Sequence, residues 1–206
     1  MASYWGTSEW PADYIEHACQ IAERLGLHAP QAEQTNYNML KRERFEREYK
    51  TLVESRGYGM SVWSPLAVGL LAGKYNDGSI PEGRVKMNME DGDDYFDKWF
   101  SPEGKEETVR VLSGLAEIAK ELGVTQAQLA LAWVIAHQDA NIALLGFSKI
   151  TQVSDNLKTL ELLQKWTPEL EKRINDHLKT QPDMEQNYRA GEPEGRRRQD
   201  HHRDQP

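Results

Sequence analysis

Apolar side chains recur every three to four residues in several stretches of the chain, which is the spacing of an amphipathic helix. The clearest stretch runs from Pro11 to Leu25, and Gly26 is placed to end it. Thr125 precedes a second apolar face and Thr167 precedes a proline, and both arrangements are typical of a helix start. The pattern predicts helices over residues 11–25, 41–56, 108–122, 126–137, 151–157 and 168–178.

Four short runs rich in apolar and aromatic residues lie between these helices. They are Ser3–Gly6, Pro30–Gln34, Gly59–Trp63 and Ile142–Leu145. Short apolar runs bounded by glycine are typical of buried strands. Strands that alternate with helices predict a parallel β/α architecture, here with four strand–helix units. The predicted fold class is therefore α/β.

Two stretches lack any such periodicity. Residues 76–102 are rich in Gly, Pro, Asp and Asn and predict a long loop, which in a compact domain is usually functional or mobile. Apolar content falls sharply from Glu185 onward, so we expect one domain over residues 1–184 and a disordered polar tail over residues 185–206. His201 and His202 in that tail could hold a metal, but a disordered segment without a metal is the interpretation we favour.

The composition limits the classes of function. A net charge of -8 and a pI near 5.3 argue against nucleic acid as a partner. No apolar run is long enough to cross a bilayer, and the first ten residues lack the features of a signal peptide. The single cysteine, Cys19, cannot form an internal disulfide and is expected to be a small buried apolar residue. We expect a cytoplasmic protein without membrane insertion.

The segment from Asn141 to Leu157 joins a predicted strand, a turn at Gly146 and the start of a helix near Thr151. Free N–H groups at a helix start attract anions, Gly146 permits close approach, and Ser148 and Lys149 add donors. The segment therefore predicts a cradle for a phosphate. An ordinary connection between a strand and a helix is the alternative, because such patterns also occur without a ligand.

The ends of the predicted strands carry polar and aromatic residues, and in β/α barrels these ends form the active site. The sequences there are YWGTSEW, EQTNYNML, WSPLAVGLLAGKY and LLGFSKITQVSDNL. In this order they resemble the second half of an aldo-keto reductase, most of all the branch that includes the β subunits of voltage-gated potassium channels. The resemblance extends from about Ser3 to Arg189.

This resemblance implies the C-terminal half of a (β/α)8 TIM barrel, about four β/α units with an extra C-terminal helix, and an extended NADP(H) cofactor. By resemblance, Ser8 and Gln34 hold the nicotinamide carboxamide and Trp63 stacks on the ring. The residues implied at the pyrophosphate are Ser64, Pro65, Leu66, Ala67 and Lys74. Those implied at the adenosine and its 2′-phosphate are Arg84, Gly146, Ser148, Gln152, Asp155 and Asn156. Without the resemblance, Trp63 would be a core aromatic residue, and Lys74 and Arg84 would be solvated charges.

The chain also departs from the family pattern. Glu9 stands where many relatives carry Asn or Arg, and a glycine precedes Arg84 where relatives usually have a serine. The family's catalytic Asp, Tyr, Lys and His belong to its first four strands, whereas this chain resembles the fifth strand onward. No Tyr–Lys–His set is evident at the predicted strand ends, so we expect no catalytic residue and no turnover from this chain alone.

Three interpretations stay open. The first is the NADP(H)-binding part of an aldo-keto oxidoreductase, whose full-length relatives reduce small carbonyl substrates by hydride transfer. The second is a non-catalytic regulatory or binding module similar to a potassium channel β subunit, with an ion channel as its partner. The third is a gene-model remnant without a function of its own. We also expect self-association, because a half-barrel has two open strand edges and an apolar face.

Overall fold

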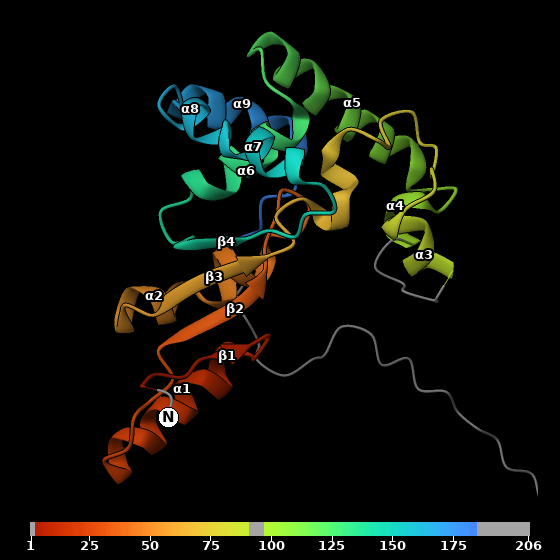
Figure 1. Ribbon diagram of the computed structural model, residues 1–206. Coiled ribbons are helices and arrows are strands. Elements are labelled where there is room, and N and C mark those ends of the chain that lie inside the picture. Colours follow the sequence, from red (N-terminus) through yellow and green to blue (C-terminus); the bar gives the residue numbers. More distant parts are fainter. Residues whose placement is uncertain (1–2, 91–96, 185–206) are drawn as a thin grey trace, which may run out of the picture.

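Four parallel strands form one sheet, as seen in the computed structural model, which describes residues 3–90 and 97–184. The strands are β1 (Thr7–Ser8), β2 (Ala32–Asn36), β3 (Gly59–Trp63) and β4 (Ile142–Leu144). Their spatial order is β1-β2-β3-β4, the same as their order along the chain (Figure 1). Each pair of neighbours is parallel, so the predicted α/β class with a parallel sheet is confirmed.

Helices fill the connections between these strands. The first connection holds α1 (Ala12–Leu25), and the second holds the π-helix η1 (Arg44–Glu48) and α2 (Lys50–Arg56). The third holds the 3-10 helix η2 (Ala67–Ala72), α3 (Arg84–Glu90), α4 (Asp97–Phe100), α5 (Lys105–Glu121) and α6 (Gln126–Ala136). After β4 come α7 (Ile150–Leu157), α8 (Thr159–Leu163) and α9 (Pro168–Leu178).

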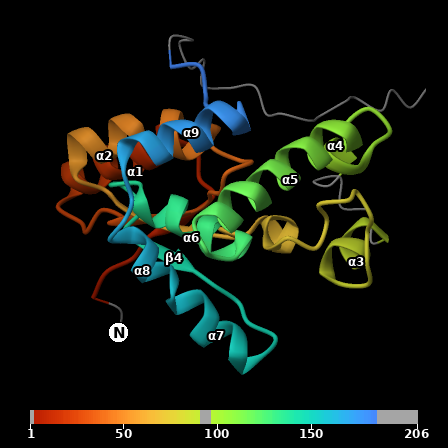
Figure 2. The same cartoon turned by 90° about the horizontal axis from the view of Figure 1, so that it is seen from above.

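The two faces of the sheet have different environments. Residues two apart on a strand share a face, and the buried face carries Glu33, Thr35, Met60 and Val62. Helix α2 lies behind β2 and β3 in Figure 1, and α1, α2 and α9 lie on one side in Figure 2. The core is therefore built between this face and the helices.

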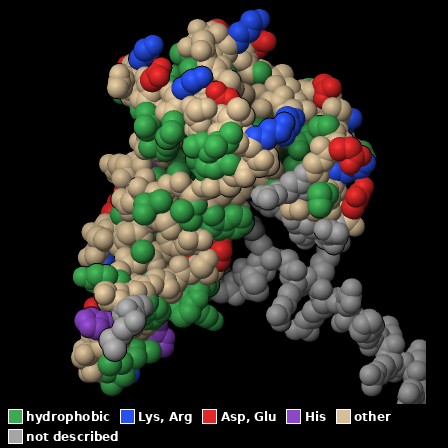
Figure 3. Space-filling model, viewed as in Figure 1, with side chains coloured by type: hydrophobic (Ala, Val, Ile, Leu, Met, Phe, Trp, Pro, Cys, Tyr) green, Lys and Arg blue, Asp and Glu red, His purple; other side chains and the backbone are tan. Residues whose placement is uncertain are grey.

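The opposite face carries none of the fully buried apolar side chains of the strands. A row of register partners crosses it, and none of the four is buried: Ser8, Gln34, Ser61 and Ile142. Figure 3, which has the same viewpoint as Figure 1, shows hydrophobic side chains gathered on this side of the molecule. This face of the sheet is therefore more exposed than the face that packs against the helices.

Several predicted helix boundaries are confirmed by their caps. Gly26 ends α1 in the left-handed region at φ 64°, and Ile15, Cys19 and Ala22 form the buried face of that helix. Thr125 and Gln128 form a capping box at the start of α6. The Thr167 hydroxyl accepts from the Leu170 N–H at the start of α9.

Three strand predictions are wrong in detail. The second strand is Ala32–Asn36 rather than Pro30–Gln34, because its pairing with β3 begins at Ala32 and extends to Asn36. The first strand is Thr7–Ser8 rather than Ser3–Gly6, because before Thr7 only the Trp5 carbonyl bonds to the next strand segment, accepting from the Gln31 N–H at 2.9 Å. The fourth strand spans Ile142–Leu144 and is not buried, since Ile142 is 57% exposed. It is the end strand of the sheet, so it has a strand neighbour on one side only.

The helix predicted over residues 41–56 begins as a π-helix. The Tyr49 N–H donates to the Arg44 carbonyl five residues earlier at 3.0 Å, and the extra residue lets Phe45, Glu48 and Tyr49 all turn inward. The α helix proper starts only at Lys50.

Three further corrections concern helices. Residues 76–102 are not loop throughout: α3 and α4 form there, with Val85 and Trp99 buried, and both are too short to show a periodic pattern. Helix α5 starts at Lys105, three residues before the predicted start. Thr151 lies inside α7, and Lys149 is the residue that precedes it as N-cap. The predicted disordered tail, residues 185–206, lies outside the described residues.

Candidate functional site at the carboxyl edge of the sheet

The carboxyl ends of parallel strands meet at one edge of a sheet, where open α/β sheets and barrels bind their ligands. Ser8 and Gln34 are register partners there, and the Ser8 hydroxyl donates to the Gln34 carbonyl at 3.2 Å. Closer to the carboxyl edge, Asn36, Trp63 and Leu144 are register partners across β2, β3 and β4. The three residues predicted at the nicotinamide, Ser8, Gln34 and Trp63, thus lie on neighbouring strands and share the exposed sheet face.

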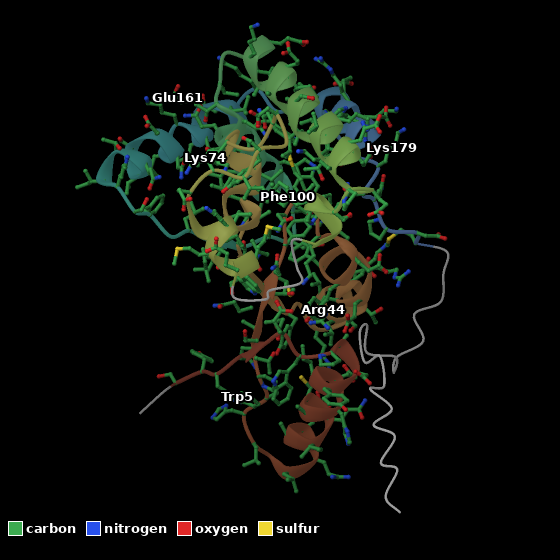
Figure 4. All side chains as sticks on the ribbon, turned by 90° about the vertical axis from the view of Figure 1, so that its right-hand side faces the viewer. Trp5, Arg44, Lys74, Phe100, Glu161 and Lys179 are labelled. Atoms are coloured by element: carbon green, nitrogen blue, oxygen red, sulfur yellow. The ribbon has the colours of Figure 1, made fainter. Side chains whose placement is uncertain are left out.

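Glu9 ties this edge together, a role that sequence reasoning did not assign to it. Its Oε1 accepts from the Trp63 indole N–H at 2.9 Å and from the Asn36 backbone N–H at 2.5 Å. Its Oε2 pairs with the Arg44 guanidinium at 2.8 Å. Arg44, labelled in Figure 4, comes from η1, so this carboxylate links three β/α units. It fixes the orientation of Trp63, which is partly exposed rather than sealed in the core.

The turn after β3 has an unusual backbone. Ser64, Ala67 and Val68 have φ of 54°, 48° and 57°, a region that non-glycine residues rarely occupy. The Ser64 hydroxyl accepts from the Val68 N–H at 2.9 Å, and the Ser64 carbonyl accepts from the Ala67 N–H at 2.9 Å. Glu9 has a φ of 57° as well, so four of the residues with strained backbone gather at this edge. Strain of this kind is characteristic of functional sites.

Asn38 holds the strained turn in place. Its side-chain amide donates to the Ser64 carbonyl and to the Asn36 side chain, each at 3.0 Å. Its side-chain oxygen accepts from the Leu40 and Lys41 N–H groups. Asn38 is completely buried, and the Asn-x-Asn spacing after β2 was the only sign of it in the sequence.

The remaining residues predicted at the pyrophosphate lie along the same turn. Pro65 and Ala67 are buried, Leu66 is half-buried, and the Leu66 carbonyl accepts from the Gly69 and Leu71 N–H groups. Lys74 follows η2 and is exposed (Figure 4). Arg84 is the first residue of α3, and its side chain lies outside the described part of the structure.

The turn between β4 and α7 contains the predicted phosphate cradle, with Gly146 exposed at its start. The Gln152 side-chain oxygen accepts from the Ser148 and Lys149 N–H groups at 2.9 and 3.0 Å and from the Ser148 hydroxyl at 3.3 Å. The donors therefore converge on one point, as a cradle requires, and the chain's own amide oxygen lies at that point. Gln152 and Asn156 are one turn apart on α7 and both are half-buried.

Asp155 is held away from this turn. Its carboxylate pairs with Lys158 at 3.2 Å, and its backbone carbonyl accepts from the Gln128 side chain at 2.6 Å. The bond from Gln128 joins α7 to α6, so Asp155 positions the helix through its backbone. Its carboxylate forms an ion pair with a residue of the same helical segment rather than contacting the turn.

A second group of titratable residues lies on the opposite, helix-covered face. Burial raises the pKa of the Glu33 carboxyl, which accepts from the Thr7 hydroxyl. Burial likewise raises the pKa of Tyr49, whose hydroxyl donates to the Trp10 carbonyl at 2.7 Å. These groups lie in the core between the sheet and the helices, on the face opposite to Ser8, Gln34 and Trp63.

Among the described tyrosines, Tyr37 is the one that directly follows the carboxyl end of a strand, and sequence reasoning missed it. Its ring stacks on Phe45 with centroids 4.0 Å apart, and its hydroxyl donates to Glu46 at 2.7 Å. Burial raises the pKa of Tyr37 well above its ordinary value. A catalytic acid needs an accessible proton and a pKa near the working pH, so Tyr37 has a structural role.

Comparison with known proteins supports a family assignment. Residues 1–178 match the family model described as the aldo/keto reductase family. A Schizosaccharomyces pombe protein named as a voltage-gated potassium channel subunit beta is 43% identical over 189 residues, 91% of this chain and 53% of that protein. Proteins with the same kind of name from Oryza sativa and Arabidopsis thaliana are each 37% identical, over 92% and 91% of this chain and 56% of their own length.

The chain thus spans about half the length of the curated relatives it matches. Within the described residues, no helix is both long and apolar enough to cross a membrane. In the same part of the chain, no cluster of three or more His, Cys, Asp or Glu residues could hold a metal ion. The family match over most of the chain, together with a parallel sheet whose carboxyl edge carries the motif residues, leads to one assignment: the chain belongs to the aldo/keto reductase family.

Proposed function

We propose that this chain is the NADP(H)-binding part of an aldo-keto oxidoreductase, with its domain over residues 1–184 and with the fold of the C-terminal half of a (β/α)8 barrel. The observation that carries the proposal is the strained carboxyl edge, where Glu9, Ser64, Ala67 and Val68 all have left-handed backbone beside the partly exposed Trp63. Strain persists only where the surroundings impose it, and at a ligand site it pre-organises the contacts.

The nicotinamide end of the cofactor, which supplies a hydride to a carbonyl carbon when bound, would be held at the first three strands. Ser8 and Gln34 offer a hydroxyl and an amide to the carboxamide, and the Trp63 indole, fixed by Glu9, offers a flat face for stacking. The turn from Ser64 to Ala67 with Lys74 would hold the pyrophosphate. Its Ala67 N–H already donates to Ser64, so Lys74 supplies most of the charge there.

The adenosine end would be held at the β4–α7 turn and by Arg84. Ser148 and Lys149 direct their N–H groups at a single point that the Gln152 amide oxygen now fills. A 2′-phosphate would take that point once the Gln152 side chain turns aside, leaving Gln152 and Asn156 to contact the ribose and the adenine. Charge-assisted hydrogen bonds to a phosphate contribute roughly 1.5–3 kcal/mol each, so NADP(H) should bind more tightly than NAD(H).

We infer that the described residues do not supply the groups needed for turnover. Of the tyrosines in the described residues, the one directly after a strand is Tyr37, and it is sealed behind Phe45 and Glu46. We therefore expect that this chain alone does not reduce a small carbonyl substrate.

The second candidate is a non-catalytic regulatory module that binds the same cofactor and associates with an ion channel. The names of the three relatives favour it. This second candidate would use the same cofactor-binding residues as the first, and the two candidates differ in the partner. Both candidates place the protein in the cytoplasm.

Calorimetric titration of the chain with NADPH and with NADH tests the proposal. We expect tighter binding of NADPH, and Ser148→Ala and Lys149→Ala should weaken NADPH binding more than NADH binding. Ser154→Ala is the matched control, because its hydroxyl bonds to the Thr151 carbonyl on the exposed side of the same helix. A folded chain that binds neither cofactor, or that loses equal affinity for both in the Ser148 variant, would refute the assignment of this turn.

A further inference from the structure

Exposed apolar side chains are concentrated in two separate parts of the molecule. One part, which we term the first unit, is β1 and α1 with their flanking residues 4–27. The other, the last unit, is β4, α7 and α8 with the turns between them, residues 142–163. Of the exposed large apolar side chains in the described residues, all but Met87, Leu122 and Met184 belong to these two units. Helices α2, α6 and α9, which lie between or behind them, carry none.

In each unit the exposed residues form a stripe along one side of a helix. On α1 the stripe is Tyr14, Ala18, Ile21 and Leu25, with spacings of 4, 3 and 4 residues. It lies beside the buried face of Ile15, Cys19 and Ala22 and continues into Trp10. On α7 and α8 the stripe is Ile150, Val153, Leu157 and Leu160, with spacings of 3, 4 and 3 residues. This spacing is that of a helix that packs on another helix.

The same two units carry the ends of the sheet. Strand β1 is bonded to β2 alone and β4 to β3 alone, so each has one edge without a strand partner in the described part of the chain. An open edge pairs readily with another strand. Each unit therefore presents a matching pair of surfaces, an open strand edge and an apolar helix stripe outside it.

We propose that two copies of this chain associate head to tail, with β4 of each copy pairing in parallel with β1 of the other. The α7–α8 stripe of each copy then packs on the α1 stripe of the other. Two such contacts related by a two-fold axis close into a ring of eight strands. Closure also covers the exposed sheet face, where Ile142 and Leu144 are 57% and 40% exposed.

A second copy fits better than other occupants because this chain itself carries a partner for each exposed face. The two faces differ from each other and lie at opposite ends of the sheet. A contact between like faces, such as α1 on α1, would leave the other stripe and the β4 edge exposed.

Sedimentation equilibrium and light scattering over a range of concentrations test the proposal. The wild-type chain should have twice its 23.6 kDa mass. Tyr14→Lys alone and Ile150→Glu alone should each shift the equilibrium to monomer by at least tenfold in the dissociation constant. Met87→Lys is the matched control, because Met87 is 61% exposed on α3, outside both units, and should leave the dimer intact.

Mixing the two variants gives a sharper result. A Tyr14→Lys copy and an Ile150→Glu copy can form one heterodimer with one unchanged contact and one contact that pairs the new opposite charges, so the mixture should recover dimer. A monomer at all concentrations overturns the proposal, as do open higher oligomers. A dimer that neither variant weakens, or that only one of them weakens, would show a different interface. Cofactor titration of the same samples reports separately on the NADP(H) site.

Discussion

Two glutamates, one directly after β1 and one in β2, show how position decides the role of one residue type. Glu9 is about one-third exposed and its carboxylate contacts three partners, Trp63, Asn36 and Arg44. Glu33 is 1% exposed on the other side of the sheet, and its Oε1 makes no hydrogen bond with the described residues. The Glu9 carboxylate therefore connects the residues of the candidate site. The Glu33 carboxylate destabilises the folded state whenever it is charged.

The pH dependence of stability should reveal Glu33. Burial raises its pKa above the ordinary value of 4.5, so the folded state holds the proton more tightly than the unfolded state. The stabilisation is fully present below the unfolded pKa and is lost as pH rises through the folded pKa. Glu33→Gln stays neutral, so its free energy of unfolding relative to wild type should increase as the pH rises above the ordinary carboxyl pKa of 4.5, by about 1.4 kcal/mol per unit of pKa difference.

Urea unfolding of both proteins at a series of pH values measures this difference. Glu54→Gln is a suitable control, since Glu54 is exposed and paired only with Lys50 at 3.9 Å, and its difference from wild type should stay within about 0.5 kcal/mol. A Glu33→Gln difference that does not change with pH would mean that the buried carboxyl titrates normally.

At the scale of elements, the sequence predicted what local rules determine. Helices α1, α6 and α9 followed from periodicity and caps, because Gly26, Thr125 and Thr167 act within one turn of their helices. The parallel β/α architecture followed from the alternation of strands and helices. The sequence did not predict the π-helix η1 or the exposure of β4, because each depends on which distant segments of the chain pack against it.

The candidate site shows the same division. The motif residues were predicted from the sequence, and the structure aligns Ser8, Gln34 and Trp63 across neighbouring strands. The links made by Glu9 span 35 residues to Arg44 and 54 to Trp63, and nothing in the linear order indicates them. Nor could the sequence show that Gln152, proposed as a cofactor contact, caps the turn it would have to open.

The start of α7 gives a prediction in which stability and binding move in opposite directions. Gln152→Glu places a carboxylate at the helix N-terminus, where it bonds to the Ser148 and Lys149 N–H groups more strongly than an amide does. We expect the free energy of unfolding to rise by about 0.3–1 kcal/mol. Binding of NADPH should weaken by tenfold or more, and binding of NADH should change less, because the new charge repels a phosphate.

Thermal unfolding and calorimetric titration of the variant measure the two effects. Gln164→Glu adds the same charge at an exposed position after α8 and controls for net charge. If Gln152→Glu leaves NADPH binding unchanged, the phosphate does not lie at this turn.

At the scale of the whole molecule, the described residues form a four-stranded sheet with one exposed face, and the chain spans about half the length of the relatives it matches. Among the described tyrosines, the one directly after a strand, Tyr37, is buried. We therefore expect NADPH consumption with reactive aldehydes or quinones to remain far below about 1 per second, the rate of an ordinary enzyme. Absorbance at the nicotinamide band measures NADPH consumption. A turnover near 1 per second by the purified chain would contradict the structural role that we assign to Tyr37 and the lack of a catalytic group at the described strand ends.

The long connection between β3 and β4 also sets an order of folding. The connections from β1 to β2 and from β2 to β3 hold only α1 and only η1 with α2. The segment from Ser64 to Asn141 holds η2 and α3 to α6 and is several times longer. Closing it costs only about 1 kcal/mol more entropy, but pairing distant segments slows folding. The first three strands should therefore acquire slow amide exchange first, and β4 should dock last, which leaves its edge open longest during synthesis.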